Sequence, residues 1–204
     1  MMYMSDEWSW HNVLPQHLWV FDKLILARNL GYVCGPAGIP VPQTDDYIVR
    51  PAINFRMMGR GASVQRLSPS DEIPDGFFWQ ERYFGNHYSF DFEHGKQILA
   101  VQGFRNDSNR LDRFSKWKKV DQEFKVPMVL QFLLSSYQYV NFEVIGTKVI
   151  EIHTRYNDDF TNHTSDWAIP VWRDEPYPDV EGDFYPNDCG DRLGLIVEKN
   201  SFKG

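Results

Sequence analysis

The sequence predicts an α+β fold in which antiparallel sheets carry helices on one side, and three observations predict it. Along the chain, the predicted elements are helix, strand, glycine-containing loop, strand, aromatic strand, hairpin, helix and hairpin. Two turn signals, His94-Gly95 and Gly146-Thr147, each join two short strands, which favours antiparallel pairing. Hydrophobic residues make up 42% and aromatic residues 16% of the 204 residues, enough for the core of one domain or of two tightly joined lobes.

The charge and the cysteines exclude several classes of protein. The chain has 21 Lys and Arg against 28 Asp and Glu, a net charge of -7, whereas general nucleic-acid binders carry a basic excess. This sum still permits a small basic pocket for one anionic ligand. Residues 1–10 do not form a signal peptide, and no apolar run approaches the roughly 20 residues of a membrane span. Cys34 and Cys189 form no CxxC motif, so we expect reduced thiols in a cytoplasmic protein.

The first half of the chain contains one predicted helix and a series of short strands. Leu18, Phe21 and Leu24 follow helical spacing within residues 16–30, and Gly31 suits the end of that helix. Residues 34–42 contain too much Pro and Gly for regular structure, which predicts a tight connector. We expect strands at residues 47–50, 63–67, 77–84, 88–92 and 97–101, with Pro51 after the first and a glycine-containing turn at 54–63.

The second half begins with a charged segment, residues 105–125, which we interpret as a mobile or surface segment. Pro127 suits the first position of a helix that runs to about residue 139. Strands at 142–145 and 148–151 flank the turn Gly146-Thr147. From residue 158 the tail is rich in Pro, Gly, Asp and Asn, and one late strand is predicted at 193–198.

Three places combine polar groups in ways that a core does not require. In the first, Arg50 ends a strand and a loop with Gly59 and Gly61 follows, where glycine backbone can approach a phosphate closely. Arg56 and Arg60 add positive charge to this loop. Taken alone, a GxG sequence in a hairpin loop is more often a plain turn.

The second place is the strand at residues 149–155. Alternation puts one set of side chains, Glu151, His153 and Arg155, on one face and another set, Ile150, Ile152 and Thr154, on the opposite face. Glu143 or Asn141, on the facing strand, would share the polar side. Carboxylates that hold a metal and an Arg that stabilises phosphoryl charge are what Mg²⁺-nucleotide chemistry needs. The alternative is a half-exposed hairpin with a surface ion pair.

The third place is the aromatic segment 78–84, which could hold an adenine between its rings; the alternative is a buried core strand.

In order and spacing, the three places resemble the ATP-grasp superfamily of ATP-dependent ligases over about residues 17–160. The family's motifs correspond here to Asp22-Lys23, Gly38-Ile39-Pro40-Val41-Pro42, Val49-Arg50-Pro51, the loop from Met58 to Ser63, Glu81 through Asp91, Asn141-Phe142-Glu143 and Glu151-Ile152-His153-Thr154-Arg155.

The resemblance implies an ATP-grasp fold, in which two lobes of antiparallel sheet with helices hold the nucleotide between them. It implies an N-terminal segment at 1–15 and an ATP-grasp domain at 16–160, whose small lobe spans about 44–101 and whose large lobe is the rest. A C-terminal extension at 161–204 would pack on the large lobe.

The resemblance also implies ATP and Mg²⁺ as cofactors, with a role for each matching residue. Lys23 and Arg50 would contact the α- and β-phosphates, and His87 would lie on the ribose side. The loop over the β- and γ-phosphates would consist of Met58, Gly59, Arg60, Gly61, Ala62 and Ser63. The adenine would lie against Gln80, Glu81, Arg82, Tyr83 and Phe84. Mg²⁺ would be held by Glu151 with Glu143 or Asn141, and with His153. Arg155 and Arg50 would be the catalytic residues, Arg155 steadying the transferred phosphate.

Four positions depart from the family's pattern: Arg50 replaces a Lys, His87 an acid, Asn141 the first metal-binding Asp and His153 an Asn. The predicted activity is that of a carboxylate–amine ligase, which uses ATP to form an acylphosphate and ADP before an amine or similar nucleophile attacks. The departures at Asn141 and His153 keep open a nucleotide-binding module without chemistry. The charged segment keeps open a phosphotransferase that acts on a hydroxyl acceptor.

The substrates implied by the resemblance are a small-molecule or peptide carboxylate and an amine. They would be held by residues 105–125, by the tail 158–204, or by a partner chain, either a second copy or another protein. Neither a membrane nor general nucleic-acid binding is expected. The compact chain also resembles small ATP-grasp proteins in bacteriophage genomes, which would place it in the host cytoplasm.

Overall fold

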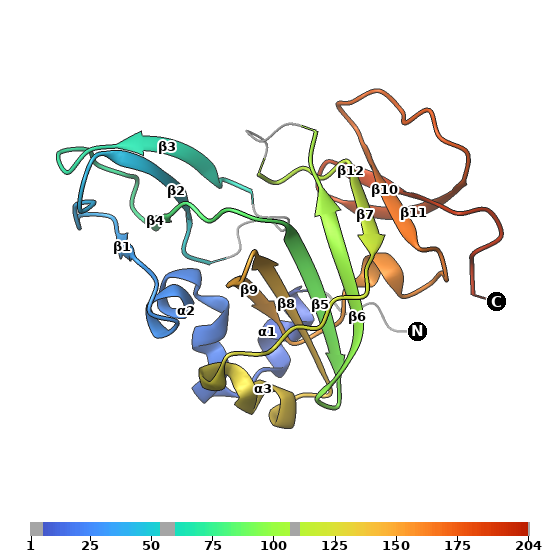
Figure 1. Ribbon diagram of the computed structural model, residues 1–204, viewed down its shortest axis with the longest axis horizontal. Helices are drawn as coiled ribbons and strands as arrows, with labels where there is room; N and C mark the ends of the chain where they lie inside the picture. Colours follow the sequence, from blue (N-terminus) through green and yellow to red (C-terminus); the bar gives the residue numbers. More distant parts are fainter. Residues whose placement is uncertain (1–5, 54–59, 107–110, 204) are drawn as a thin grey trace.

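The computed structural model describes residues 6–53, 60–106 and 111–203, which form two antiparallel sheets with helices packed beside them (Figure 1). The small sheet has the order β1-β4-β2-β3, with β1 (Cys34–Pro36), β2 (Asp45–Pro51), β3 (Ser63–Leu67) and β4 (Phe77–Glu81). The large sheet has the order β11-β12-β10-β7-β6-β5-β8-β9. Its strands are β5 (His87–Glu93), β6 (Lys96–Phe104), β7 (Lys116–Lys119), β8 (Tyr139–Ile145), β9 (Lys148–His153), β10 (Trp167–Trp172), β11 (Asp183–Cys189) and β12 (Arg192–Val197). The predicted α+β class is confirmed.

The predicted helix at 16–30 is two helices that meet at Asp22. A 3-10 helix, η1 (Pro15–Phe21), ends there and α2 (Lys23–Asn29) begins. Asp22 is extended, and its carboxylate accepts a hydrogen bond from the backbone N–H of Ile25 at 2.9 Å. This is an N-cap, which satisfies a donor that the new helix leaves open. Lys23 is therefore the first residue of α2, and its position depends on this cap.

Two further helices differ from prediction. A short helix α1 (Asp6–Asn12) precedes η1. Pro127 is extended rather than helical, and it precedes η2 (Met128–Leu130) and α3 (Gln131–Ser136). The predicted helix to residue 139 ends early because Tyr137 is already extended and β8 starts at Tyr139. None of the helices in the described ranges combines the length and apolarity needed to cross a bilayer.

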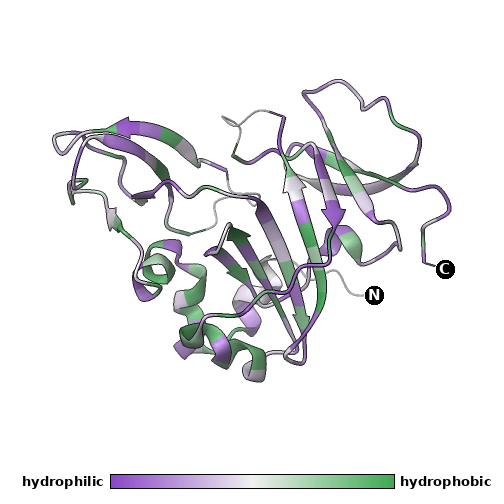
Figure 2. Ribbon diagram, in the orientation of Figure 1, coloured by the Kyte–Doolittle hydropathy of each residue, from purple (hydrophilic) through white to green (hydrophobic). Residues whose placement is uncertain are grey.

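The main core lies between the helices and one face of strands β5, β8 and β9. Phe90, Phe142, Leu130 and Leu133 are among its fully buried side chains. Figure 2 shows hydrophobic residues along these strands and on the helices next to them. Val140, Phe142 and Val144 alternate with polar residues along β8, so one face of the strand serves the core and leaves the other free.

The charged segment 105–125 contains a strand that was not predicted. β7 pairs with β6 on one side and β10 on the other, and its Trp117 is buried. The lysines on either side of Trp117 explain the prediction of a surface segment, because one buried aromatic among charges gives a weak strand pattern.

The lobe boundaries also differ from those expected. The small sheet runs from Cys34 to Glu81 instead of 44–101, because β5 and β6 pair with each other and with the large sheet. Part of the predicted 34–42 connector is β1, which pairs with β4. The C-terminal extension, 161–204, supplies strands to the large sheet. Through the β7–β10 pairing, it continues the large sheet with β10, β12 and β11.

Two glycines let the connection from β4 to β5 pass close to the β8–β9 turn. Gly85 has φ +122°, and a Cβ on it would lie 2.8 Å from the Cα of Gly146. A Cβ on Gly146 would lie 2.7 Å from the carbonyl oxygen of Phe84. The backbone N–H of Gly146 also donates to the carbonyl of Asn86 at 2.9 Å. This contact holds the connection from β4 to β5 against the β8–β9 turn of the large sheet.

We expect Gly85→Ala to lower the free energy of unfolding by about 3 kcal/mol, because backbone strain adds to a clash with backbone that cannot rotate away. Gly38→Ala is the matched control. It also has positive φ, +83°, but nothing lies within 4 Å of its Cβ position. This control should lose only the strain, about 1 kcal/mol. Urea denaturation would measure both, and equal losses would contradict the proposed close contact.

Candidate functional site

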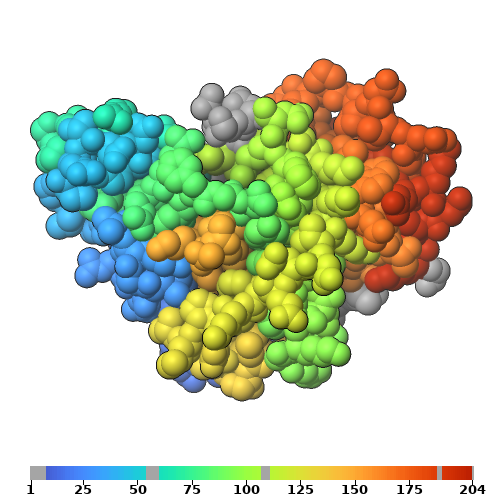
Figure 3. Space-filling view, in the orientation of Figure 1, coloured from blue at the N-terminus to red at the C-terminus, as the bar shows by residue number. Residues whose placement is uncertain are grey.

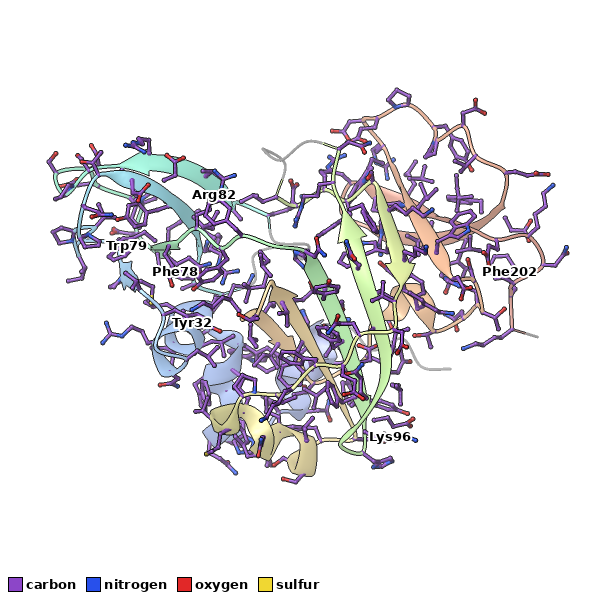
Figure 4. The ribbon with its side chains drawn as sticks, viewed as in Figure 1. Tyr32, Phe78, Trp79, Arg82, Lys96 and Phe202 are labelled. Carbon is purple, nitrogen blue, oxygen red and sulfur yellow. The ribbon has the colours of Figure 1, made fainter. Side chains whose placement is uncertain are left out.

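A cavity of about 780 Å³ lies between the two sheets and is lined by residues of both. The space-filling view shows the molecule hollowed between the small sheet, in cyan, and the large sheet (Figure 3). Figure 4 shows Arg82 just beyond β4, the strand that carries Phe78 and Trp79. Many sequence-predicted site residues line this cavity: Lys23, Arg50, Arg60, Ala62, Gln80, Arg82, Tyr83, Phe84, His87, Asn141, Glu143, Glu151, His153 and Arg155.

The β8–β9 hairpin brings the four predicted metal ligands together. Asn141 is directly opposite His153, and Glu143 is directly opposite Glu151. All four line the cavity, so both candidates on β8 share the polar face. Directly opposed residues in an antiparallel pair project from the same side of the sheet, which is why the register makes one polar surface of the four.

One part of the predicted alternation is wrong. Ile152 and Thr154 are buried away from the cavity, as expected, but Ile150 lines it. The register shifts at Glu143/Val144, where Val144 pairs with Val149 and Ile150 is left over. This β-bulge changes which way a side chain faces. It also frees the carbonyl of Ile150, which accepts a hydrogen bond from Arg50 Nη2 at 3.0 Å.

Lys23 and Glu151 form an ion pair inside the cavity, with Lys23 Nζ 3.0 Å from Glu151 Oε2. Only 5% of the Lys23 side chain and 15% of the Glu151 side chain are exposed. The other oxygen of Glu151 lies 3.3 Å from His153 Nε2. A buried ammonium group needs a counterion, and the Glu151 carboxylate is that counterion for Lys23. Glu151 also remains part of the cavity lining.

Arg50 is a buried cation on the opposite wall. Its Nη2 donates to Gln80 Oε1 at 3.1 Å and to the Ile150 carbonyl, and both acceptors are neutral. Burial lowers the pKa of Arg50, and the charge of Glu151 raises it by a smaller amount. Within the described ranges, Arg50 Nε is buried with no hydrogen-bond partner. The guanidinium therefore carries charge and a donor that an anionic ligand in the cavity could use.

His87 lines the cavity and is held between an arginine and a carboxylate. Arg105 Nη2 is 3.2 Å from its Nδ1, and its Nε2 is hydrogen-bonded to Glu143 Oε2. Because a guanidinium only donates, Nδ1 accepts and Nε2 carries the proton that Glu143 accepts. Both ring nitrogens are thus used within the protein, and a ribose hydroxyl would have to compete for one of them.

Asp91 is paired with Asn141 across strands β5 and β8, and sequence reasoning assigned it no role. The Asn141 side-chain amide donates to Asp91 Oδ1 and to Ser89 Oγ, each at 2.7 Å. The backbone N–H of Asn157 donates to both oxygens of Asp91. Burial raises the pKa of Asp91 to about 7, although these hydrogen bonds lower it. The alternation His87, Ser89, Asp91 along β5 was the signal that could have found it.

The predicted nucleotide loop is only partly described. Met58 and Gly59 lie outside the described residues, whereas Arg60 and Ala62 line the cavity and Gly61 and Ser63 do not. Arg60 Nη2 lies 2.7 Å from Asp191 Oδ2, in the turn between β11 and β12. In the predicted adenine segment, Glu81 does not line the cavity and instead lies 3.9 Å from Lys148. Burial raises the pKa of Tyr83, whose hydroxyl has no partner among the described residues.

Three residues of the far wall, Asp159, Asn187 and Arg192, were not singled out by sequence reasoning. Arg192, at the start of β12, forms two hydrogen bonds with Asp159, at 2.7 and 2.8 Å. Asn187 donates to the same carboxylate at 3.1 Å. Arg155 also lines the cavity, and its Nη1 donates to the Tyr156 carbonyl at 3.0 Å. The tail thus contributes to the cavity, although its irregular composition did not indicate which of its residues would do so.

The donor set fits Mg²⁺ only if a ligand supplies further oxygens. Among the residues that the structure describes, no group of three or more His, Cys, Asp and Glu is arranged to hold a metal. Mg²⁺ is usually bound by one or two carboxylates together with substrate phosphates. Glu143 and Glu151, opposed across the hairpin and facing the cavity, match that need. The described protein side chains by themselves do not provide a complete set of Mg²⁺ ligands.

Comparisons with known proteins identify the fold. No protein-family model and no curated protein matches the sequence. L-amino acid ligase from Bacillus licheniformis aligns with a TM-score of 0.51 and 10% identity, over 88% of this chain and 66% of that one. A protein from Archaeoglobus fulgidus described as an ATP-grasp superfamily member gives 0.48 and 18%, over 87% and 64%. The ATP-grasp ligase PsnB, with Mg, ADP and a precursor variant, gives 0.44 and 14%, over 71% and 52%.

At 10% identity the likeness to the L-amino acid ligase shows the fold alone, and the predicted fold class is confirmed. The chain spans between 52% and 66% of the lengths of these three structures.

Proposed function

We propose that the chain is an ATP-dependent ligase that activates a carboxylate for attack by an amine. One carboxylate oxygen attacks the γ-phosphorus of ATP, and the bond from that phosphorus to ADP breaks. The amine then attacks the acylphosphate carbonyl, phosphate leaves, and the amine loses a proton. The observation that carries the proposal is the polar surface of β8 and β9, which lines one cavity together with Lys23 and Arg50.

The residues of the cavity suit this chemistry by position and charge. Phosphoryl transfer needs little covalent help from a protein, and it depends on positioning and on neutralising phosphate charge. Lys23 and Arg50 supply buried positive charge, and Arg155 lines the same cavity. Gln80 on β4, and Tyr83 and Phe84 just after β4, line the cavity where we place the adenine. Glu143 and Glu151 would hold Mg²⁺, which supplies charge neutralisation on the phosphates when bound.

The test is a measurement of products. Purified protein with MgATP should release ADP and phosphate only when a carboxylate is added, and an amide should form when an amine is also present. Chromatography of the nucleotides distinguishes ADP from AMP. AMP as the product, or no turnover with a broad panel of carboxylates and amines, would contradict the proposal.

A second function is favoured by specific contacts in the cavity. Glu151 is held by Lys23, Glu143 by His87, and the Asn141 amide by Asp91. A site whose carboxylates are bound by the protein's own groups could bind a nucleotide without catalysing a reaction. Such a module would be stabilised by MgATP against heat and would never release ADP. ADP release that requires a carboxylate would rule it out.

A further inference from the structure

Among the described residues, seven lysine and arginine side chains line the cavity; apart from Arg155, they fall into two groups. Lys23, Arg60, Arg82 and Arg192 each form an ion pair with a carboxylate of the protein. Arg50 and Arg105 also line the cavity, and within the described parts of the chain neither forms an ion pair with a carboxylate. Two partly or fully buried cations without counterions favour two anions in the ligands of this cavity. The proposed function requires two, the nucleotide phosphates and the carboxylate to be activated.

Contacts with the protein hold the Arg105 side chain in one orientation, but they do not use all of the hydrogen-bond donors of its guanidinium. Its Nη2 donates to His87 Nδ1 and, at 2.9 Å, to the carbonyl of Leu111. Its guanidinium carbon lies 4.0 Å from the centroid of the Phe114 ring. Arg105 Nε is buried and has no partner among the described residues. Burial lowers the pKa of Arg105, which agrees with a charge that nearby carboxylates compensate only at a distance.

The position of Arg105 separates it from Arg50. Arg50 belongs to β2 of the small sheet, whereas Arg105 follows the end of β6 in the large sheet. A single imidazole, that of His87, connects Arg105 to Glu143, the predicted Mg²⁺ ligand. An anion on Arg105 would therefore lie close to the place where the transferred phosphate is expected. The substrate carboxylate and the phosphate would repel each other when they are close. A fixed cation between them, here the Arg105 guanidinium, lowers that repulsion.

The walls around Arg105 indicate the rest of the ligand. Leu111, Phe114 and Trp117 line the cavity beside it, and the Phe114 and Trp117 rings lie 4.2 Å apart by their centroids. Apolar and aromatic side chains favour an apolar or aromatic group on the ligand.

We propose that Arg105 binds the carboxylate of the acceptor substrate, a carboxylic acid that carries an apolar or aromatic group. The assignment rests on the proposed function, because that function supplies the second anion. It places a substrate-carboxylate site of this chain at Arg105, just after β6.

Phenylacetate is a suitable probe, and phenylacetamide is its neutral control. Calorimetry would measure MgADP binding first and then phenylacetate binding to the MgADP complex. We expect wild-type protein to bind phenylacetate and to bind phenylacetamide at least ten-fold more weakly. Arg105→Gln should weaken phenylacetate binding by about ten-fold or more and leave MgADP binding unchanged.

Two further variants keep the test decisive. Arg105→Lys keeps the charge without the planar fork, so it should bind phenylacetate better than Arg105→Gln does. It also replaces Arg105→Gln as the test variant if that protein does not fold. Arg66→Gln, an exposed arginine on β3, should bind both ligands like wild type.

Equal phenylacetate binding by wild type and Arg105→Gln would overturn the proposal, as would binding of the amide with the same affinity. Loss of MgADP binding in the Arg105 variants would also overturn it, because Arg105 would then serve the nucleotide. Failure of wild type to bind MgADP would contradict the proposed function. Phenylacetate binding that still depended on Arg105 would in that case leave the acceptor site standing.

Discussion

Glu151→Gln is expected to lower the rate of ADP formation by about 10²–10³-fold while the protein stays folded. Glu151 is the carboxylate on which three features of the cavity meet: the ion pair with Lys23, the contact with His153 and the position opposite Glu143. The amide keeps the size and one oxygen, so it preserves packing while removing the charge that a cation beside the phosphates requires. Steady-state ADP release with a carboxylate substrate measures the change.

The main alternative cause of such a loss is instability, because Lys23 is buried and would lose its counterion. Thermal unfolding of the variant must therefore be measured alongside activity. Glu151→Asp keeps the charge on a shorter side chain, so it should be as stable as Glu151→Gln or more stable and still lose activity. Glu72→Gln, an exposed substitution in the loop between β3 and β4, is the matched control and should retain wild-type turnover. A turnover within two-fold of wild type in Glu151→Gln would show that this carboxylate has no part in the chemistry.

Sequence patterns predicted the polar hairpin well because the side-chain period of a strand is two. Alternation alone placed Glu151, His153 and Arg155 on one face, and the cavity lies on that face. The bulge at Ile150 was not predictable, because an extra residue leaves no mark in a pattern of apolar and polar letters. Arg105 and Arg192 were not singled out as individual site residues, although residues 105–125 and the tail 158–204 were expected to hold the substrates. Their places depend on strands β7, β10 and β12 joining one sheet, and pairing between distant segments is not encoded locally.

The fold was predictable where local signals and tertiary structure agree. β3 has the bounds that were predicted, and the β8–β9 turn falls at Gly146 and Thr147. The helix at 16–30 failed at Asp22, since an N-cap in the middle of an apolar period divides one helical pattern into two helices. Strand β10 was not predicted, for a different reason. Its residues Trp167–Trp172 include Pro170, which argues against a strand between two partners, yet β10 lies between β7 and β12.

Phe142→Ala is expected to cost about 3–5 kcal/mol of the free energy of unfolding, the largest loss of stability for one substitution that we predict. Phe142 is fully buried in the main core, and its ring centroid lies 5.6 Å from that of Phe92 and 5.6 Å from that of Phe124. The surrounding aromatic rings hold open the void that the truncation leaves in the core. The core therefore cannot collapse to recover the lost contacts. Urea denaturation measures the loss. Met128→Ala, a truncation of a side chain that is 88% exposed, is the control and should cost less than about 0.5 kcal/mol.

The same substitution tests how the core and the site are coupled. Asn141 and Glu143 flank Phe142 on β8 and face the cavity, while Phe142 faces the core. If β8 is held in place chiefly by Phe142, then Phe142→Ala should lower the stabilisation by MgATP as well as the stability itself. Phe142→Leu, which refills most of the space, should cost less stability and restore the MgATP effect. A variant that loses stability but keeps the full MgATP shift would show that hydrogen bonds from β5 and β9 alone position the two polar residues. In that case the site would depend on two separate contacts, that of Asn141 with Asp91 and that of Glu143 with His87.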